Sequence, residues 1–412
     1  MTPAPTPSKP RPVAMLTHSY YEEDPRVRRE AEALVAAGRE VDVFALRRSD
    51  DPPTEVLDGV TIRRLGVQRH QGAGLATYLR EYLAFLVRAG FALTGAHRRR
   101  RYGVVQVHTL PDFLVFAALP LRLVGVPVIL DLHEAMPEFF RSRFHGRAGR
   151  IGYALLRLQE RASTAFASAV VTVNDALGDR LVAIGVPASK VTVVPNAPSL
   201  ARFDPGRHPS RTFMSDGTLR LVYTGALSPI YELDVVLGAI AHLDVIRPGL
   251  PVRLDLYGRD FAEVPLREQA VQLGVADRVT FHGRIPLDDV PGAVAAADVG
   301  LAPTRRSDYT DFSLSTKAFE YAAMGVSVVA SRLPMVERTF GEDVVTYTPG
   351  DADDLAAALI RLIDAPEERE ARLVRALRRI RDRGWERESA RYLALVDRLA
   401  RPPRAGSAGQ AS

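Results

Sequence analysis

Residues 311–331 read DFSLSTKAFEYAAMGVSVVAS, a polar loop that leads into a short amphipathic helix. Gly325 stops this helix, and the run VSVVAS follows as a buried strand. A helix held between a polar loop and a strand rich in valine is one step of an alternating α/β chain. The rest of the sequence repeats this step, so the stretch decides the fold class.

The alternation of apolar runs and helical stretches continues along the whole chain. Near-continuous apolar strands that are joined by helices form parallel sheets covered on both faces. The sequence therefore predicts an α/β protein with two doubly wound domains that face each other across a cleft. The other predicted strands are VAMLT (13–17), VDVFAL (41–46), VVQVH (104–108), VPVILD (126–131), VVTV (170–173), VTVV (191–194), LVYTG (221–225), VRLDLYG (252–258), VTFHG (279–283) and VGLAP (299–303).

The composition fits a globular protein of two or three domains, since the chain has 412 residues and 47% of them are hydrophobic. The absence of cysteine excludes disulfides, thiolate zinc sites, iron–sulfur clusters and cysteine nucleophiles. No signal peptide is recognised, and prolines interrupt the apolar stretch 113–130, so we expect a cytoplasmic protein. Basic and aromatic residues do not interleave, so we expect no nucleic-acid partner.

The positive charge of the chain is concentrated in its first half. The net charge is +5, and residues 61–161 hold 16 arginines against six acids, including the arginine run 98–101. Such a surface could meet anionic lipid or a phosphorylated substrate, or it could simply be solvated. The stretch 75–95 has the residue mixture of an amphipathic helix, which either packs on the core or lies on a membrane surface.

The loop and helix of 311–331 have the chemistry of an anion site. Ser313, Ser315 and Thr316 supply hydroxyls, the first helical turn supplies free N–H groups, and Lys317 adds a full charge, which together suit a diphosphate. Glu320 lies one turn after Thr316 and could accept from ribose hydroxyls. The alternative is a capped surface helix with a Lys317–Glu320 pair.

Other candidate residues follow the predicted strands, because open parallel sheets bind ligands just beyond the carboxyl ends of their strands. The positions concerned are His18, His108, His133, Glu134, Asn196, Gly225, Gly258, Arg259, Gly283, Arg284 and the loop 305–316.

In their order, these stretches resemble the retaining GT-B glycosyltransferases of family 4, also called group 1 glycosyltransferases. STKAFEYAAMGVSVVAS is similar to the donor-binding segment of that family, and GVADRVTFHGRIPLDDVPGAVAAADVGLAPT to its base-binding part. HSYYEEDPRVRREAEALVAAGREVDV resembles the opening of the N-terminal domain. WERESARYLALVDRL resembles the last helix, which in the family crosses back onto that domain. The resemblance covers roughly residues 13–400.

The resemblance and the periodicity together divide the chain into two Rossmann-like domains with tails. The first domain is expected to bind the acceptor and the second to bind the nucleotide-sugar. The expected segments are a disordered tail (1–12), the N-terminal domain (13–200), a linker (201–217), the C-terminal domain (218–384), the returning helix (385–401) and a second disordered tail (402–412).

The resemblance also implies roles for individual residues. His133 matches the histidine of the family's HE loop, which is expected near the C6 hydroxyl of the sugar and the reacting centre. Lys317 and Glu320 match the diphosphate and ribose contacts and complete the expected catalytic set. The expected donor-binding residues are Gly225, Arg259, Arg284, Ile285, Ser313, Ser315 and Thr316, and the expected acceptor-side residues are His18, Tyr20, Arg26, His108 and Glu134.

The chain departs from the common family pattern at three positions. The first member of the usual glutamate pair falls on Phe312, and the usual Arg and Lys after the first C-domain strand fall on Ala226 and Glu232. The cations available to replace them are Arg259, Arg305 and Arg306.

The activity implied by the resemblance is transfer of a sugar from a nucleotide-sugar to a glycan or lipid-linked acceptor, with retained configuration. It implies no metal and no other cofactor. We expect a role in cell-envelope polysaccharide or glycoconjugate biosynthesis, with the basic N-terminal domain held at the inner face of the cell membrane. A nucleotide-sugar epimerase of the same architecture and a catalytically silent nucleotide-sugar-binding partner remain as alternatives.

One motif imitates a metal site, namely the acidic group Asp351, Asp353 and Asp354. These residues open a predicted helix, so we interpret them as cap and helix-dipole residues.

Overall fold

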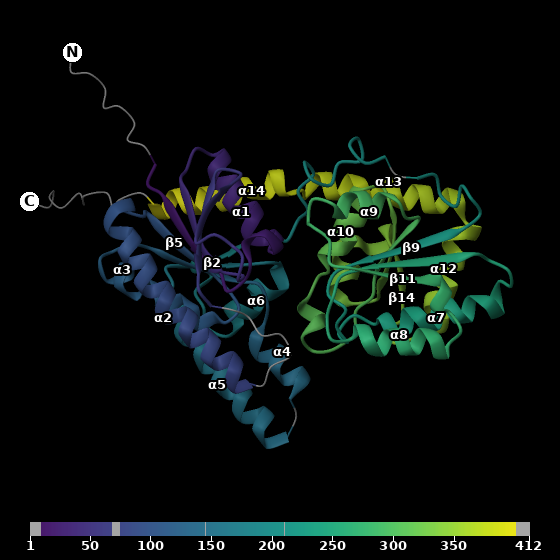
Figure 1. Cartoon of the computed structure of the whole chain (residues 1–412), viewed down its shortest axis with the longest axis horizontal. Helices are drawn as coiled ribbons and strands as arrows, with labels where there is room; N and C mark the ends of the chain where they lie inside the picture. The colour runs from purple at the N-terminus through teal and green to yellow at the C-terminus, as the bar shows by residue number, and fades with distance from the viewer. Residues whose placement is uncertain (1–9, 68–74, 145, 210, 401–412) are drawn as a thin grey trace, which may run out of the picture. The chain divides into compact units, whose positions relative to one another are not determined.

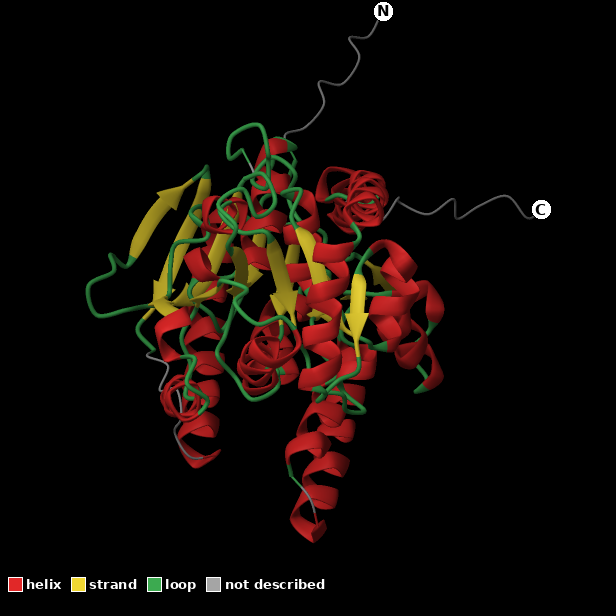
Figure 2. Ribbon diagram, turned by 90° about the vertical axis from the view of Figure 1, so that its right-hand side faces the viewer, coloured by secondary structure: helices red, strands yellow, loops and turns green. Residues whose placement is uncertain are grey.

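The computed structural model divides the chain into two compact units. Unit 1 is built from the chain up to Pro195 and again from Ser389 onward, and unit 2 is Asn196–Glu388 (Figure 1). Helices flank the strands (Figure 2). The residues that the structure describes are 10–67, 75–144, 146–209 and 211–400.

Unit 1 contains an eight-stranded sheet with the strand order β3-β4-β2-β1-β5-β6-β7-β8. Its strands are β1 (Val13–Leu16), β2 (Val41–Leu46), β3 (Thr54–Leu57), β4 (Val60–Leu65), β5 (Val104–His108), β6 (Val128–Leu132), β7 (Ala169–Thr172) and β8 (Val191–Val193). Its helices are η1 (Tyr21–Glu23), α1 (Pro25–Ala36), α2 (Leu75–Arg100), η2 (Asp112–Ala118), α3 (Leu119–Leu123), α4 (Met136–Arg143), α5 (Gly146–Phe166), α6 (Asp175–Ala183), η3 (Ala188–Lys190) and α14 (Trp385–Ala400), which belongs to this unit from Ser389 on.

Alternating side chains of β5 show how the helices cover this sheet. Val105 and Val107 point into a core that contains Phe85 of α2 and Leu114 of η2. Gln106, between them, points the other way and bonds to side chains of α1 and α14. In Figure 1, α2, α3 and α5 lie on one side of the sheet and α1 and α14 on the other.

The edge of this sheet is a hairpin that the sequence analysis does not predict. Strands β3 and β4 pair antiparallel, and Asp58 and Gly59 connect them with φ values of 49° and 79°. Two consecutive positive φ values in an Asp-Gly pair are typical of a type I′ turn. Buried and half-buried residues alternate along β4, so the apolar runs that reveal the central strands are missing here.

Unit 2 contains a six-stranded sheet, parallel throughout, with the order β11-β10-β9-β12-β13-β14. Its strands are β9 (Leu219–Thr224), β10 (Val252–Tyr257), β11 (Val279–Gly283), β12 (Val299–Ala302), β13 (Ser327–Ser331) and β14 (Val345–Tyr347). Its helices are α7 (Leu233–Ile246), α8 (Glu263–Gln272), η4 (Ala276–Arg278), α9 (Val290–Ala295), η5 (Thr310–Phe312), α10 (Thr316–Ala323), α11 (Pro334–Phe340), η6 (Gly341–Asp343), α12 (Ala352–Asp364) and α13 (Pro366–Asp382).

The sheet of unit 2 has a separate core on each face. Leu221 and Tyr223 of β9 pack with α7, α8 and α12. Val222, which points to the other face, packs with α9, α10, α11 and α13. The helix α10 is therefore fixed by its own apolar side, and its first turn is held at the carboxyl end of the sheet.

The segment expected to be a linker, 201–217, is part of unit 2. Phe203 is buried in the core against α10 and α13. The buried carboxylate of Asp298 accepts from Arg211 Nη1 and from the N–H of Met214, both at 2.8 Å. Its turn-rich composition identifies a segment without regular structure, but such a segment can also be anchored to a domain surface.

The two predicted tails lie largely outside the described residues. Residues 10–12 are described, and there the carbonyl of Pro12 accepts from the N–H of Gly103 at 2.8 Å. Among the described residues, no helix combines the length and the apolar character that crossing a bilayer requires.

Candidate active site

Three glycine turns follow the neighbouring strands β9, β10 and β11. Gly225, Gly258 and Gly283 have φ values of 140°, 153° and 74°, which residues with a side chain rarely adopt. A Cβ atom on Gly258 would lie 1.7 Å from the carbonyl oxygen of Gly225. The turns therefore pack backbone against backbone, and they leave a ridge without side chains at the carboxyl edge of the sheet, where ligands bind in folds of this type.

Lys317, the second residue of α10, lies over this ridge. Its side chain is only 8% exposed, and a Cβ on Gly225 would come within 3.0 Å of its Nζ. The Nζ lies 3.9 Å from the ring centroid of Tyr231 and 5.2 Å from that of Tyr223. Within the described part of the chain it has no carboxylate partner. An ammonium group that is buried against aromatic rings and lacks a counter-ion attracts an anion.

The loop before α10 adds hydrogen-bonding groups. Ser315 is the N-cap residue, but its Oγ makes no capping bond and is buried without a partner in the described structure. Thr316 begins the helix, Ser313 is half-buried before it, and Glu320 is half-buried one turn later. Because Lys317 is buried and not paired with Glu320, the alternative of a capped surface helix with that ion pair does not hold.

Of the three arginines considered as replacement cations, only Arg259 has no carboxylate partner among the described residues. Arg259 directly follows the glycine turn after β10, is exposed, and has no partner among the described residues. The other two are neutralised, since Arg305 pairs with Asp234 at 3.0 Å and Arg306 with Asp311 at 3.3 Å. In the loop after β11, Arg284 is exposed and Ile285 is half-buried.

Of the positions that depart from the family pattern, Glu232 has a clear structural role. Glu232 is buried and accepts from the N–H of Gly350 at 2.9 Å and from Tyr347 Oη at 3.3 Å. Burial raises the pKa of its carboxyl group. Glu232 thereby fastens the loop before α12 to the start of α7. Ala226 is exposed, and its carbonyl accepts from Tyr223 Oη; Phe312 is half-buried at the end of η5.

The acidic group at the start of α12 behaves as predicted. Asp351 accepts from the N–H groups of Asp353 and Asp354 at 3.0 and 2.9 Å, so it is a helix cap.

Unit 1 has its own polar cluster at the carboxyl end of its sheet, centred on Asp131 of β6. Arg26 of α1 donates from Nε and Nη2 to the two carboxylate oxygens, both at 2.8 Å. His108 Nδ1 lies 3.0 Å and His133 Nε2 lies 3.2 Å from Asp131 Oδ2. Asp131 and His108 are fully buried, whereas the side chain of His133 is 19% exposed. His133 is thus the member of the cluster that a substrate can reach.

The charges in this cluster stabilise one another. Burial alone would raise the pKa of Asp131, but Arg26, His133 and His108 hold it well below its ordinary value. Burial disfavours a charged His108, but the hydrogen bond and charge of Asp131 raise the pKa of that imidazole above its ordinary value. Burial raises the pKa of neighbouring Glu30. Asp131 therefore stays ionised and orients the imidazole of His133.

A second ring of buried groups supports the cluster. Gln106 donates to Glu30 Oε2 and accepts from Tyr392 Oη, both at 2.6 Å, and Glu30 lies 3.2 Å from Arg26. Sequence reasoning missed Asp131, Glu30, Gln106 and Tyr392. The available signal was a carboxylate at the end of an apolar strand, two residues before His133.

Several predicted acceptor-side residues are packed into the protein. Arg26 is 4% exposed and also donates to the carbonyl of Val194, and His108 is fully buried, so both position His133 and cannot touch an acceptor here. His18 packs edge-on against Tyr82 and Phe85, with ring centroids 4.8 and 5.1 Å away. The Tyr20 ring lies beneath the Arg48 guanidinium, and Glu134 is half-buried beside His133.

His108, Asp131 and His133 are also residue types that bind metals, and one ligand atom of each lies within 4.8 Å of the others. The guanidinium of Arg26 holds both oxygens of Asp131, and this fixed positive charge disfavours a divalent cation at the same place. The cluster fits a hydrogen-bonded network better than a metal site.

Asp112, at the start of η2, gives a pH-dependent prediction. It is buried, its Oδ1 has no partner in the described structure, and burial, with Glu160 adding to it, raises its pKa to about 7. The folded-state pKa of Asp112 exceeds its unfolded one. The contribution of this carboxyl group to the free energy of unfolding is therefore fully present below pH ~4 and is lost as the pH rises towards ~7. Against Asp112→Asn, the wild-type free energy of unfolding should fall by about 3 kcal/mol between pH 5 and pH 8. Denaturant titration by circular dichroism measures this, and a pH-independent difference contradicts it.

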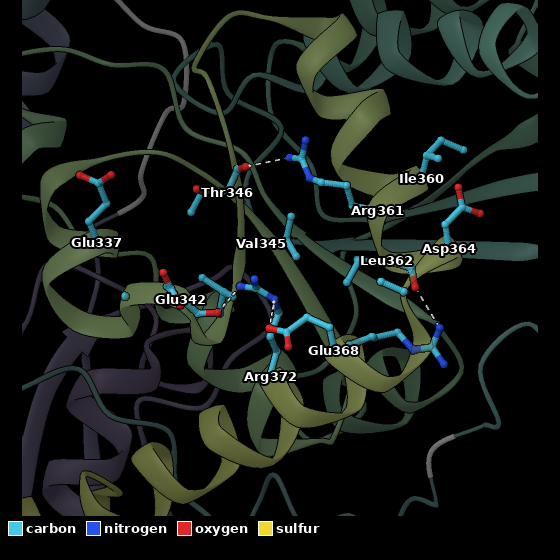
Figure 3. Close-up of a pocket in the computed structure, with 14 residues that line it drawn as sticks. Glu337, Glu342, Val345, Thr346, Ile360, Arg361, Leu362, Asp364, Glu368 and Arg372 are labelled. Carbon is cyan, nitrogen blue, oxygen red and sulfur yellow. Dashed lines mark hydrogen bonds and ion pairs between the residues drawn. The ribbon is translucent and has the colours of Figure 1, made fainter.

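A hollow of about 640 Å³ in unit 2 lies away from these residues, beside β14 and the junction of α12 with α13 (Figure 3). Its arginines are all engaged. Arg361 Nη2 donates to the carbonyl of Thr346, Arg369 Nη1 to that of Leu362, and Arg372 pairs with Glu368 at 3.0 Å. None of the predicted donor-binding residues lines it, so we do not assign the donor to this hollow.

Two family models match the chain, one in each half. Residues 24–197 match the model described as "Glycosyl transferase 4-like domain", and residues 218–365 match "Glycosyl transferases group 1". The MMP α-(1→4)-mannosyltransferase of Mycolicibacterium hassiacum is 26% identical over 91% of this chain and 87% of its own. A D-inositol 3-phosphate glycosyltransferase of Thermomonospora curvata is 28% identical over 90% of this chain and 87% of its own.

Solved structures share the fold at low identity. Sucrose-phosphate synthase from Thermosynechococcus elongatus has a TM-score of 0.76 and 18% identity, covering 94% of this chain and 99% of its own. HepE from Anabaena, solved with UDP and glucose, has a TM-score of 0.67 and 16% identity, covering 94% of this chain and 100% of its own. The family models match both halves of the chain, and each half contains the Rossmann-like sheet that this family has. The chain therefore belongs to the group 1 glycosyltransferases with the GT-B fold.

Proposed function

We propose that the chain transfers a sugar from a nucleotide-sugar to a hydroxyl of a glycan or lipid-linked acceptor, with retention of the anomeric configuration and without a metal or other cofactor. The acceptor would belong to cell-envelope polysaccharide or glycoconjugate biosynthesis, at the inner face of the cell membrane. The observation that carries the donor assignment is the buried ammonium of Lys317, which faces the glycine ridge without a counter-ion.

The donor diphosphate is assigned to the first turn of α10. Lys317, the unpartnered Ser315 Oγ and the free N–H groups of the turn offer positive charge and donors in one place. Arg259 supplies a second uncommitted cation at the same edge of the sheet. Charge builds up on the leaving diphosphate as the glycosidic bond breaks, so these fixed donors stabilise the transition state more than the ground state.

Retention is proposed from the state of the Asp131 carboxylate in unit 1. Asp131, beside His133, is bound through both oxygens by Arg26, so it is not available as a nucleophile or as a general base. We therefore favour a front-face reaction in which the acceptor hydroxyl attacks the anomeric carbon and passes its proton to a donor phosphate oxygen. We assign His133, which Asp131 orients, to a contact with the transferred sugar.

The relatives support a nucleotide-sugar donor. The two curated relatives reported above are named as a mannosyltransferase and an inositol-phosphate glycosyltransferase. Among structures of the same fold, HepE is described in complex with UDP and glucose, and an E. coli protein with UDP-2-fluoro glucose.

The test is a panel of UDP-, GDP-, ADP- and dTDP-sugars in a thermal shift assay, with and without EDTA. A ligand at about 100 times its Kd stabilises the folded state by about 2.7 kcal/mol and should raise the melting temperature of unit 2 by about 5–10 °C, because it binds only the folded state. The donor found in this way is then offered to glycan acceptors, and the anomeric signal of the product is read by NMR.

Each alternative has its own result in that experiment. An inverted product contradicts retention, and loss of transfer in EDTA contradicts metal independence. Conversion of the nucleotide-sugar without an acceptor identifies an epimerase, and binding without any turnover identifies a silent partner. No shift with any nucleotide in a folded preparation removes the donor assignment.

A further inference from the structure

The helix α2 presents a stripe of apolar side chains to solvent. Leu79, Leu83, Val87 and Phe91 are all exposed, and Phe91 is 77% exposed. Their spacing of four residues keeps them on one face of the helix. The opposite face, with Phe85, Ala89 and Leu93, is fully buried in the core of unit 1. The helix is thus apolar on both sides, and the core accounts for only one of them.

Two other helices on the same side of the sheet repeat this arrangement. In α5, Ile151, Leu155 and Leu158 are exposed, whereas Glu160 and Ser163 on its other face are buried. The helix α3 and the residue after it expose Leu119, Leu123 and Val124. Both α2 and α5 pack against η2, which continues directly into α3, and Figure 1 shows α2, α3 and α5 on one side of the sheet. Exposed apolar groups of this extent mark an interaction surface.

The charges around these side chains are of one sign. Of the acids in 75–144 and 146–166, Glu134 is partly exposed and the rest are buried. Six arginines on α2 and α5 are exposed and have no ion pair in the described structure, namely Arg80, Arg98, Arg99, Arg147, Arg150 and Arg161. The surface therefore combines apolar groups with uncompensated positive charge.

This combination selects among possible occupants. In a symmetric contact between two copies of the chain, the arginines of one copy would face the same arginines of the other, and their positive charges would repel. At a bilayer surface, the apolar side chains enter the boundary of the acyl region while the arginines extend to anionic headgroups. The pattern thus fits a lipid surface better than a second copy.

We propose that the outward faces of α2, α3 and α5 form a docking surface for a membrane that contains anionic lipids, and we call it the arginine–apolar face. The proposal deepens the membrane location given under the proposed function, but it rests on these helices and not on the donor site. It holds unit 1 against the bilayer, where a lipid-linked acceptor would be presented.

The experiment is sedimentation of the full chain with vesicles of phosphatidylcholine alone or mixed with phosphatidylglycerol. We expect binding to the mixed vesicles that weakens as salt is raised. An apolar variant, Leu83→Ser with Phe91→Ser and Leu155→Ser, should lose most of it. A basic variant, Arg80→Ser with Arg98→Ser and Arg150→Ser, should lose about fivefold in affinity per arginine removed. The matched control replaces exposed valines of unit 2, Val245, Val264 and Val271, by serine and should bind like the wild type.

All replaced residues are exposed, and circular dichroism and the nucleotide-induced thermal shift verify that each variant is folded and binds its donor. Equal recovery from both vesicle types, or full binding by the apolar variant, overturns the proposal. So does a dimer that the apolar variant abolishes while no variant binds vesicles, because the face then contacts a second copy. A chain that binds vesicles but no nucleotide would contradict the proposed function and leave the docking surface standing.

Discussion

Replacing Lys317 by methionine is expected to weaken nucleoside diphosphate binding about 10- to 100-fold, because one charge-assisted contact is worth about 1.5–3 kcal/mol. Turnover should fall further, by about 10²–10³, since charge accumulates on the diphosphate in the transition state. Methionine places an apolar group of similar size where the Nζ lies over the Tyr231 ring, so the fold without ligand should melt close to the wild type. Isothermal titration measures the dissociation constant of the nucleoside diphosphate whose sugar form the thermal shift panel identifies.

A purely structural lysine would give a different result. If Lys317 only packs against Tyr231, affinity for the diphosphate and for the corresponding nucleoside would change equally. If it holds the diphosphate, the nucleoside should bind the variant and the wild type alike. The matched control is Arg305→Met, which removes a cation that Asp234 already neutralises, and it should change affinity less than threefold. Unchanged diphosphate affinity in Lys317→Met would remove the donor site from α10.

The start of α10 could be singled out from the sequence as a candidate anion site because its signal is local. The hydroxyl-rich loop, the helix start and Lys317 lie within a few residues of one another, and a short helix before a buried strand leaves little freedom in where its first turn lies. What the sequence could not show is that Tyr231 buries the ammonium and that Arg305 and Arg306 are already paired. Those contacts join separate elements, and the local pattern does not contain them.

Arg26, His108 and His133 of the cluster in unit 1 are among the predicted site residues, but its centre Asp131 and the contacts that join its members escaped prediction for the same reason. Arg26 and Asp131 are 105 positions apart, and Tyr392 and Gln106 are 286 apart. Each polar residue taken alone resembles an exposed residue at a strand end or on a helix. They become buried partners because β1, β5 and β6 are neighbours in the sheet and α14 returns to this unit, which is information about topology. The hairpin β3–β4 was missed because β3 is mostly exposed, burial alternates along β4, and no apolar run marks either strand.

Replacing Arg26 by methionine is expected to cost unit 1 about 3–5 kcal/mol of unfolding free energy, because it leaves the buried carboxylates of Asp131 and Glu30 without their cation. The loss should be smaller at pH 5 than at pH 8. Without Arg26, His133 and His108 are left to oppose the effect of burial on Asp131, so the pKa of its carboxyl rises. Protonation then relieves part of the buried charge at low pH, and stability is lost as the pH rises.

The readout has to report on unit 1 alone. The single tryptophan, Trp385, is counted with unit 2 but begins α14, which continues into unit 1, so its fluorescence does not report on unit 1 alone. Amide hydrogen exchange of unit 1 peptides is the suitable measurement. The control is Arg28→Met on the same helix, whose partners Glu32 and Asp58 are 30% and 53% exposed and can be rehydrated. It should cost less than about 1 kcal/mol. If both variants weaken unit 1 equally and without dependence on pH, Arg26 acts through its stem packing, and Asp131 orients His133 without needing the guanidinium.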